Sequence, residues 1–229
     1  MFKINNNFTK IILALFFINA IVEIIAETFA YKPVIYITKP LIPILLMVLY
    51  WFSSSVKNTL FFLILLFSAV TNLLFIPSST NFLFFAIIAF TIHRILLLFY
   101  IFKFVKITSF KFFILATIPI IAVFYYLLIE STNIPDNSYF ILFFQILLIG
   151  TLVGLALANY IKADNLQNTY LMISALLFAG LQLVIYIEKY FLVGENFIIL
   201  RPIAMSLNVM AFFSFYKFIM VTEQIKLQK

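Results

Sequence analysis

The sequence has no cysteine, only four glycines and a single histidine. The lack of cysteine excludes disulfides, thiolate metal sites and cysteine nucleophiles. Four glycines are too few for a glycine-rich phosphate loop, and one histidine excludes a metal centre built on several histidines. Charge is also scarce, because 10% of the 229 residues are charged whereas 66% are hydrophobic. A soluble domain of this length cannot bury so much apolar surface, so the composition indicates an integral membrane protein.

Eight apolar stretches are long enough to cross a membrane as helices, which takes roughly 20 residues each. Turn residues mark several of the short connections, such as SSS at 53–55 and PSS at 77–79. The apolar runs are continuous and lack the alternation of a membrane β-barrel. We therefore predict an all-α, polytopic membrane helix bundle in a single integral membrane domain, residues 1–229. The predicted spans are about 10–30, 33–52, 58–77, 80–102, 110–130, 138–160, 168–190 and 198–220.

Lysine and arginine are distributed unevenly between the two ends of the predicted spans. With the amino terminus inside, ten lysines fall near inner ends: Lys3, Lys10, Lys57, Lys103, Lys106, Lys111, Lys162, Lys217, Lys226 and Lys229. Three cationic residues fall near outer ends: Lys32, Lys189 and Arg201. This asymmetry predicts that both termini are cytoplasmic, in a multi-pass protein of the bacterial inner (cytoplasmic) membrane. It also accounts for the net charge of +7, so no nucleic-acid partner is expected.

Polar side chains inside the predicted spans are costly, at about 2.5–3.5 kcal/mol for an ionisable group, and are therefore candidates for function. The ionisable ones are Glu23 and Glu27 on the first span, Lys39 on the second, His93 and Arg94 on the fourth, and Glu188 on the seventh. The neutral amides are Asn72, Gln145, Gln182 and Asn208. Several of these positions fall at similar depths, so we expect a shared polar cavity that opens toward the outer side.

Structural roles are open alternatives for the same residues. Lys39 can form an ion pair with Glu23 or Glu27 that only joins adjacent helices. Arg94 can extend to lipid phosphate, and His93 can be a hydrogen-bonded histidine of the bundle. The small-residue pattern of Gly150 and Gly154 predicts close helix packing inside the bundle. Interhelical hydrogen bonds are the simpler role for Gln145 and Asn208.

Four short segments, taken in order, resemble the motifs of a known family. They are YITKPL at 36–41, FSAVTN at 67–72, FTIH at 90–93 and ALLFAGLQ at 175–182. They resemble motifs on the second, third, fourth and seventh spans of the YhhN-like, or lysoplasmalogenase, family. That family has this length and eight predicted spans, and the order and spacing agree over roughly residues 30–220. The resemblance implies hydrolysis of the vinyl-ether bond of a lysoplasmalogen, which releases a fatty aldehyde and a glycerophospho head group.

The chain departs from the family pattern at two positions, since Asn72 and Gln182 stand where the family has Asp. Amides can orient water or a head group, but they cannot transfer the proton that vinyl-ether cleavage requires. Glu23, an intramembrane carboxyl, is then the candidate acid. Glu27 and Glu188 are the other carboxylates that could replace the missing Asp residues. The candidate catalytic residues are thus Glu23, Asn72, His93 and Gln182, and the candidate phosphate-binding residues are Lys39 and Arg94. No cofactor or metal is expected.

Three functions remain open from the sequence. The first is a membrane hydrolase that acts on an ether lysolipid. The second is a non-catalytic relative, a lipid-binding or accessory membrane protein that kept the cavity and lost the acids. The third is a small-solute transporter, although the sequence shows no internal repeat and no pair of helices broken by Gly or Pro. In the first two, the partner is a membrane lipid or lysolipid.

Overall fold

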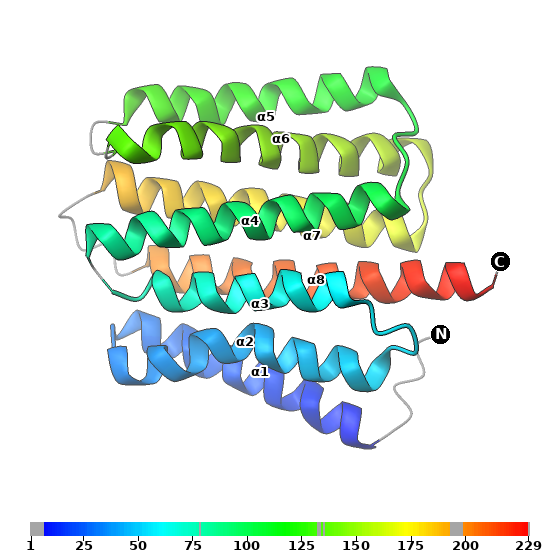
Figure 1. Cartoon of the computed structure of the whole chain (residues 1–229), viewed down its shortest axis with the longest axis horizontal. Coiled ribbons are helices and arrows are strands. Elements are labelled where there is room, and N and C mark those ends of the chain that lie inside the picture. Colours follow the sequence, from blue (N-terminus) through cyan, green and yellow to red (C-terminus); the bar gives the residue numbers. More distant parts are fainter. Residues whose placement is uncertain (1–6, 78, 132–133, 135, 193–198, 229) are drawn as a thin grey trace. The chain divides into compact units, whose positions relative to one another are not determined.

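The computed structural model describes residues 7–77, 79–131, 134, 136–192 and 199–228, and the regular elements found there are all helices (Figure 1). The predicted all-α class is therefore confirmed. Contacts divide the chain into two units, Met1–Leu96 and Leu97–Lys229, and α4 (Thr80–Phe104) belongs to both. Each unit is described by itself, and the single domain stays a prediction.

The first unit contains α1 (Asn7–Thr28), α2 (Lys32–Ser53), α3 (Thr59–Leu74) and most of α4. A tight turn joins α1 to α2, so the two helices form a hairpin, and α3 packs against α2 (Figure 1). In this turn Ala30 adopts a left-handed conformation with φ of 52°. Tyr31 N donates to Ala26 O across the turn at 2.9 Å. Pro33 follows in the first turn of α2, where its missing N–H costs no hydrogen bond.

Side chains also organise the connection between α2 and α3. Ser54 Oγ accepts hydrogen bonds from Val56 N and Lys57 N, both at 3.1 Å. Asn58 caps α3, because its Oδ1 accepts from Leu60 N at 3.0 Å. These bonds hold the two helix ends together in a connection of only five residues, 54–58.

The second unit continues from the end of α4 through a chain of antiparallel neighbours. It contains α5 (Phe110–Glu130), α6 (Tyr139–Lys162), α7 (Leu166–Tyr186) and α8 (Leu200–Leu227), with a short 3₁₀ turn η1 (Asp136–Ser138) and a π-helical turn η2 (Ile187–Phe191). α5 packs on α6, α6 on α7, and α7 on α8. Close packing of α5 on α6 depends on glycine, because a Cβ added to Gly154 would overlap Thr117 and lie 3.1 Å from Phe113 O. The predicted role of the small-residue face is thus confirmed.

In the described part of the chain, eight α-helices coincide with the eight predicted apolar stretches, but they differ in length. Seven are long and apolar enough to cross a membrane. α3 is the exception among the described helices, because its 16 residues rise about 24 Å against a hydrocarbon core of roughly 30 Å. A multi-pass membrane protein is therefore supported, while the third span, predicted over about 58–77, ends earlier than expected at Leu74.

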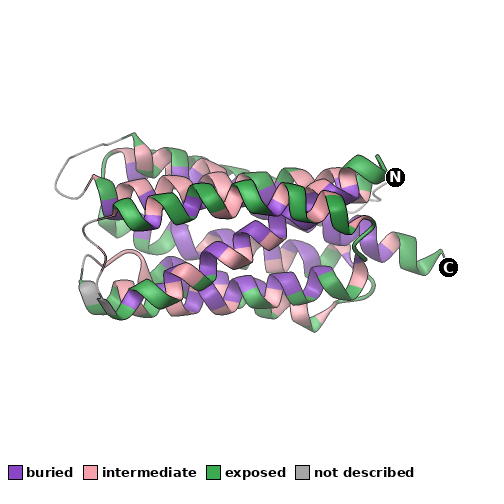
Figure 2. Cartoon of the chain, turned by 90° about the horizontal axis from the view of Figure 1, so that it is seen from above, coloured by how far each residue is buried: buried purple, intermediate pink, exposed green. Residues whose placement is uncertain are grey.

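Burial differs from that of a soluble protein in the amount of apolar surface that is exposed (Figure 2). Large apolar side chains are exposed along the helices, for example Ile21 at 58% and Leu115 at 65%. In contrast, the ionisable side chains of Glu23, His93 and Arg94 are almost completely buried. Lipid is the environment in which such a surface is stable, because apolar contact with lipid tails costs nothing while a polar surface does.

Candidate functional site

A proline in α2 leaves one backbone carbonyl in need of a donor. In a helix, the carbonyl of Lys39 would accept from the N–H four residues later, but that residue is Pro43. Asn72 of α3 supplies the missing donor, since its Nδ2 lies 3.0 Å from Lys39 O. Neighbouring helices commonly satisfy such freed carbonyls inside a membrane. Asn72 therefore joins α3 to α2 at the proline.

The adjacent carbonyl of α2 is held in the same way from the opposite neighbour. Asn19 of α1 donates from Nδ2 to Thr38 O at 2.9 Å. Thr38 Oγ1 lies within hydrogen-bonding distance of Glu23 Oε2 and of Val34 O, so its single proton is available to either acceptor. Two amides and one hydroxyl thus join α1, α2 and α3 around a short stretch of α2.

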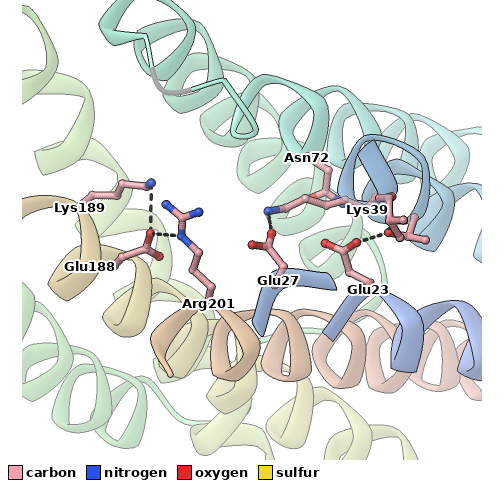
Figure 3. A network of polar contacts seen from close by, with 9 residues as sticks. Glu23, Glu27, Lys39, Asn72, Glu188, Lys189 and Arg201 are labelled. Carbon is pink, nitrogen blue, oxygen red and sulfur yellow. Dashed lines mark hydrogen bonds and ion pairs between the residues drawn. The ribbon is translucent and has the colours of Figure 1, made fainter. Parts of the chain in front are cut away.

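An ion pair lies next to these bonds (Figure 3). Lys39 Nζ lies 2.6 Å from Glu27 Oε1, and the two side chains are only 11% and 3% exposed. Glu23 and Glu27 are one turn apart on α1, so both carboxyls face α2. The pairing that the sequence left open between Lys39 and either glutamate is therefore made with Glu27.

Glu23 has a different environment from Glu27. Its side chain is fully buried, and its Oε2 accepts from Thr38. Its second oxygen, Oε1, is buried and has no hydrogen-bond partner within the described residues. Within the described residues, Glu23 is thus held through one carboxyl oxygen by α2, and the other oxygen is enclosed in the interior of the first unit.

His93 and Arg94 are buried on α4, each only 1% exposed. The His93 ring stacks on Phe90, with centroids 5.9 Å apart and an interplanar angle of 11°. Arg94 Cζ lies 4.8 Å from the centroid of the same ring. Arg94 is therefore a buried side chain, and its role in binding phosphate stays a prediction.

Gln182 lies on α7 in the second unit and is described apart from the cluster of α1, α2 and α3. It is 4% exposed, and neither of its amide atoms has a hydrogen-bond partner in the described part of the chain. Buried amides without partners are unusual, since the loss of water contacts is not compensated. The structure thus brings together Glu23, Glu27, Lys39 and Asn72 from the candidates, and it describes Gln182 separately.

A second charged group occurs at the junction of η2 and α8 (Figure 3). Glu188 Oε1 lies 3.0 Å from Arg201 Nε and 3.3 Å from Lys189 Nζ. The Arg201 side chain is 47% exposed, so water screens this pair more than the pair of Glu27 and Lys39. The described residues contain no group of three His, Cys, Asp or Glu that could hold a metal ion.

Sequence reasoning missed two residues of the cluster, Asn19 and Thr38. A signal for Asn19 exists, because Asn19, Glu23 and Glu27 recur every four residues and so share one face of α1. The position of Pro43, four residues after Lys39, likewise indicates that a carbonyl of α2 requires an external donor. Neither signal identifies Asn72 as that donor, since this depends on how α3 packs on α2.

Comparisons of the chain with protein-family models, with curated proteins and with solved structures give no match.

Proposed function

We propose that this chain is a lysolipid hydrolase of the YhhN-like type, embedded in the bacterial inner membrane with both termini in the cytoplasm. The observation that supports this proposal most is the environment of Glu23, a fully buried carboxyl that Thr38 holds through one oxygen. Glu27 and Lys39 neutralise each other beside it. Glu23 is thus the carboxyl of the cluster that remains for acid chemistry.

The proposed reaction follows from the chemistry of an enol ether. Glu23 in its acid form donates a proton to the carbon of the double bond that is not attached to oxygen. The product is an oxocarbenium ion, which the resulting carboxylate stabilises. Water adds to this cation and returns a proton to Glu23, which gives a hemiacetal. The hemiacetal then breaks into a fatty aldehyde and the head-group alcohol, so one water is consumed for each bond cleaved.

A non-catalytic lipid-binding role is the second candidate, and a specific observation favours it. Asn72 occupies a position where the resembled family has Asp, and its side-chain amide donates a hydrogen bond to the Lys39 carbonyl. The Lys39 ammonium group forms an ion pair with Glu27. Both side chains thus have structural partners before any lipid binds. A protein that kept the fold and lost the reaction would have these features.

The deciding experiment measures aldehyde release from a lysoplasmalogen by the purified full-length protein in detergent micelles. We expect slow release, and we expect Glu23→Gln to lower it by about 10²–10⁴-fold because a general acid is removed. Glu130→Gln is the matched control, since Glu130 is an exposed carboxyl at the end of α5 and its loss should leave the rate unchanged.

Two results would count against this proposal, the first against the role of Glu23 and the second against hydrolysis. Equal rates for the unmodified protein and Glu23→Gln would remove Glu23 from the reaction. Saturable lysolipid binding without aldehyde release would favour the non-catalytic candidate. The orientation is tested separately by reporter fusions, which should report opposite sides for the carboxyl terminus and for a fusion in segment 131–137.

A further inference from the structure

One end of the second unit gathers cationic side chains. The carboxyl ends of α4, α6 and α8 and the amino ends of α5 and α7 meet there, as hydrogen bonds across the connections show. Thr108 N donates to Asn159 Oδ1 at 3.2 Å, and Gln167 Nε2 donates to Thr222 Oγ1 at 3.0 Å. The lysines on these helix ends and connections are Lys103, Lys106, Lys111, Lys162 and Lys226. The opposite end carries Glu130 together with a mixed ion-pair group, in which Glu188 lies between Lys189 and Arg201.

Two of these lysines share one aromatic ring. Lys226 Nζ of α8 lies 3.8 Å from the centroid of Phe104, and Lys103 Nζ of α4 lies 5.8 Å from it. Two helices far apart in the sequence thus bring two positive charges to one partly exposed ring. Among the described residues, no carboxylate lies within ion-pair distance of either ammonium group. Glu223, one turn before Lys226, is buried and has an interaction of its own.

This arrangement has the chemistry of an anion site at a membrane surface. Lys103 and Lys226 both approach the same ring, so an anion bound beside this ring would be attracted by both charges. The ring adds an apolar surface at the level where spanning helices end, which is where lipid head groups lie. A phospholipid supplies both parts, a phosphate for the ammonium groups and an acyl-glycerol portion for the ring. A soluble acidic protein segment would supply the charge without the apolar portion.

We propose that Lys103, Phe104 and Lys226 form a binding site for the head-group phosphate of an anionic phospholipid. The site lies entirely in the second unit and does not depend on the cluster around Glu23. The two proposals are tested independently, because a lack of aldehyde release would not affect lipid binding at this site, and a lack of lipid binding would not affect aldehyde release. The occupant is a structural or regulatory lipid and not the substrate.

The test uses the purified full-length chain and phosphatidylglycerol as the probe. Native mass spectrometry follows lipid binding during a titration, with phosphatidylcholine of the same acyl chains as the reference lipid. We expect the Lys103→Gln, Lys226→Gln double variant to bind phosphatidylglycerol about thirtyfold more weakly, since each cation near an anionic lipid contributes roughly fivefold. The Lys103→Arg, Lys226→Arg double variant should stay within about threefold of the unmodified chain, because it keeps both charges.

The matched control is the Lys106→Gln, Lys111→Gln double variant. It removes the same charge from exposed positions at the same end of the unit, but neither lysine contacts Phe104 in the described structure. We expect a loss below about threefold, as general screening of surface charge predicts. An equal loss in both glutamine variants would overturn the site and leave only a diffuse basic surface. Displacement of the lipid by inorganic phosphate in molar excess would overturn the choice of a lipid and indicate a free-phosphate site.

Discussion

Removal of Lys39 should destabilise the protein more than any exposed lysine would. The Lys39→Met variant leaves Glu27 in place, with its side chain only 3% exposed and its partner at 2.6 Å gone. Breaking a buried ion pair from one side typically costs about 3–5 kcal/mol, because the remaining charge is uncompensated. A domain is stable by only about 5–15 kcal/mol in total, so this loss is a large fraction. The Lys39 carbonyl keeps its bond to Asn72, since the backbone is unchanged.

A double-mutant cycle separates the ion pair from other effects of the substitution. The Glu27→Gln, Lys39→Met double variant removes both charges and should lose much less than the sum of the single variants. The assay is reversible unfolding in mixed detergent micelles, with helix content followed by circular dichroism. Lys32→Met is the control, because Lys32 is exposed on the first turn of the same helix and should change stability by less than about 0.5 kcal/mol. A loss below about 1 kcal/mol for Lys39→Met, or strictly additive losses in the cycle, would refute the reasoning.

Three further predictions concern helix packing, the carbonyl of Lys39 and the exposed ion pair. Gly154→Ala should lower the free energy of unfolding by about 1–3 kcal/mol, because the new Cβ would meet Thr117. Gly180→Ala is the control, since its new Cβ meets nothing closer than 3.7 Å and should be neutral or stabilising. Similar losses for both variants in thermal unfolding would contradict this prediction. Asn72→Leu should cost about 1–3 kcal/mol in the same assay, since it leaves a carbonyl of α2 without a donor, and an unchanged midpoint would remove that role. Arg201→Gln should lower the free energy of unfolding by less than about 1 kcal/mol, because its ion pair is half exposed, and this difference should disappear at high salt. A loss near that of Lys39→Met would contradict this prediction.

The helices could be predicted from the sequence because lipid imposes a simple length rule. Each apolar run of about twenty residues gave a helix, and connections rich in Ser, Pro and Asn gave the ends. The rule was less reliable at α3, where the predicted span continued to about residue 77 but the helix ends at Leu74. A turn begins after Leu74, and Pro77 makes the helical conformation unfavourable for the residue that precedes it.

The pairing inside the cluster could not be predicted, because it depends on helix rotation. Glu23 and Glu27 share one face, so either can reach Lys39 according to periodicity alone. The turn between α1 and α2 decides the register, and it includes Ala30 with a left-handed backbone that a non-glycine residue rarely adopts. The contact of Arg94 with Phe90 follows from helical spacing, since the two residues are one turn apart on α4, whereas the burial of Arg94 depends on the packing of α4, which a single sequence does not reveal.

The structure gives a physical reason for an amide at position 72. A donor is required there because Pro43 cannot supply an N–H to the Lys39 carbonyl. An ionised aspartate only accepts hydrogen bonds, so it would face that carbonyl as a second acceptor. The requirements of α2 and the requirements of proton transfer therefore conflict at this position, and the amide satisfies the helix. If the chain is the hydrolase proposed above, acid chemistry in the first unit falls to a carboxyl that holds no backbone group, and Glu23, joined to Thr38 through its side chain, meets that condition.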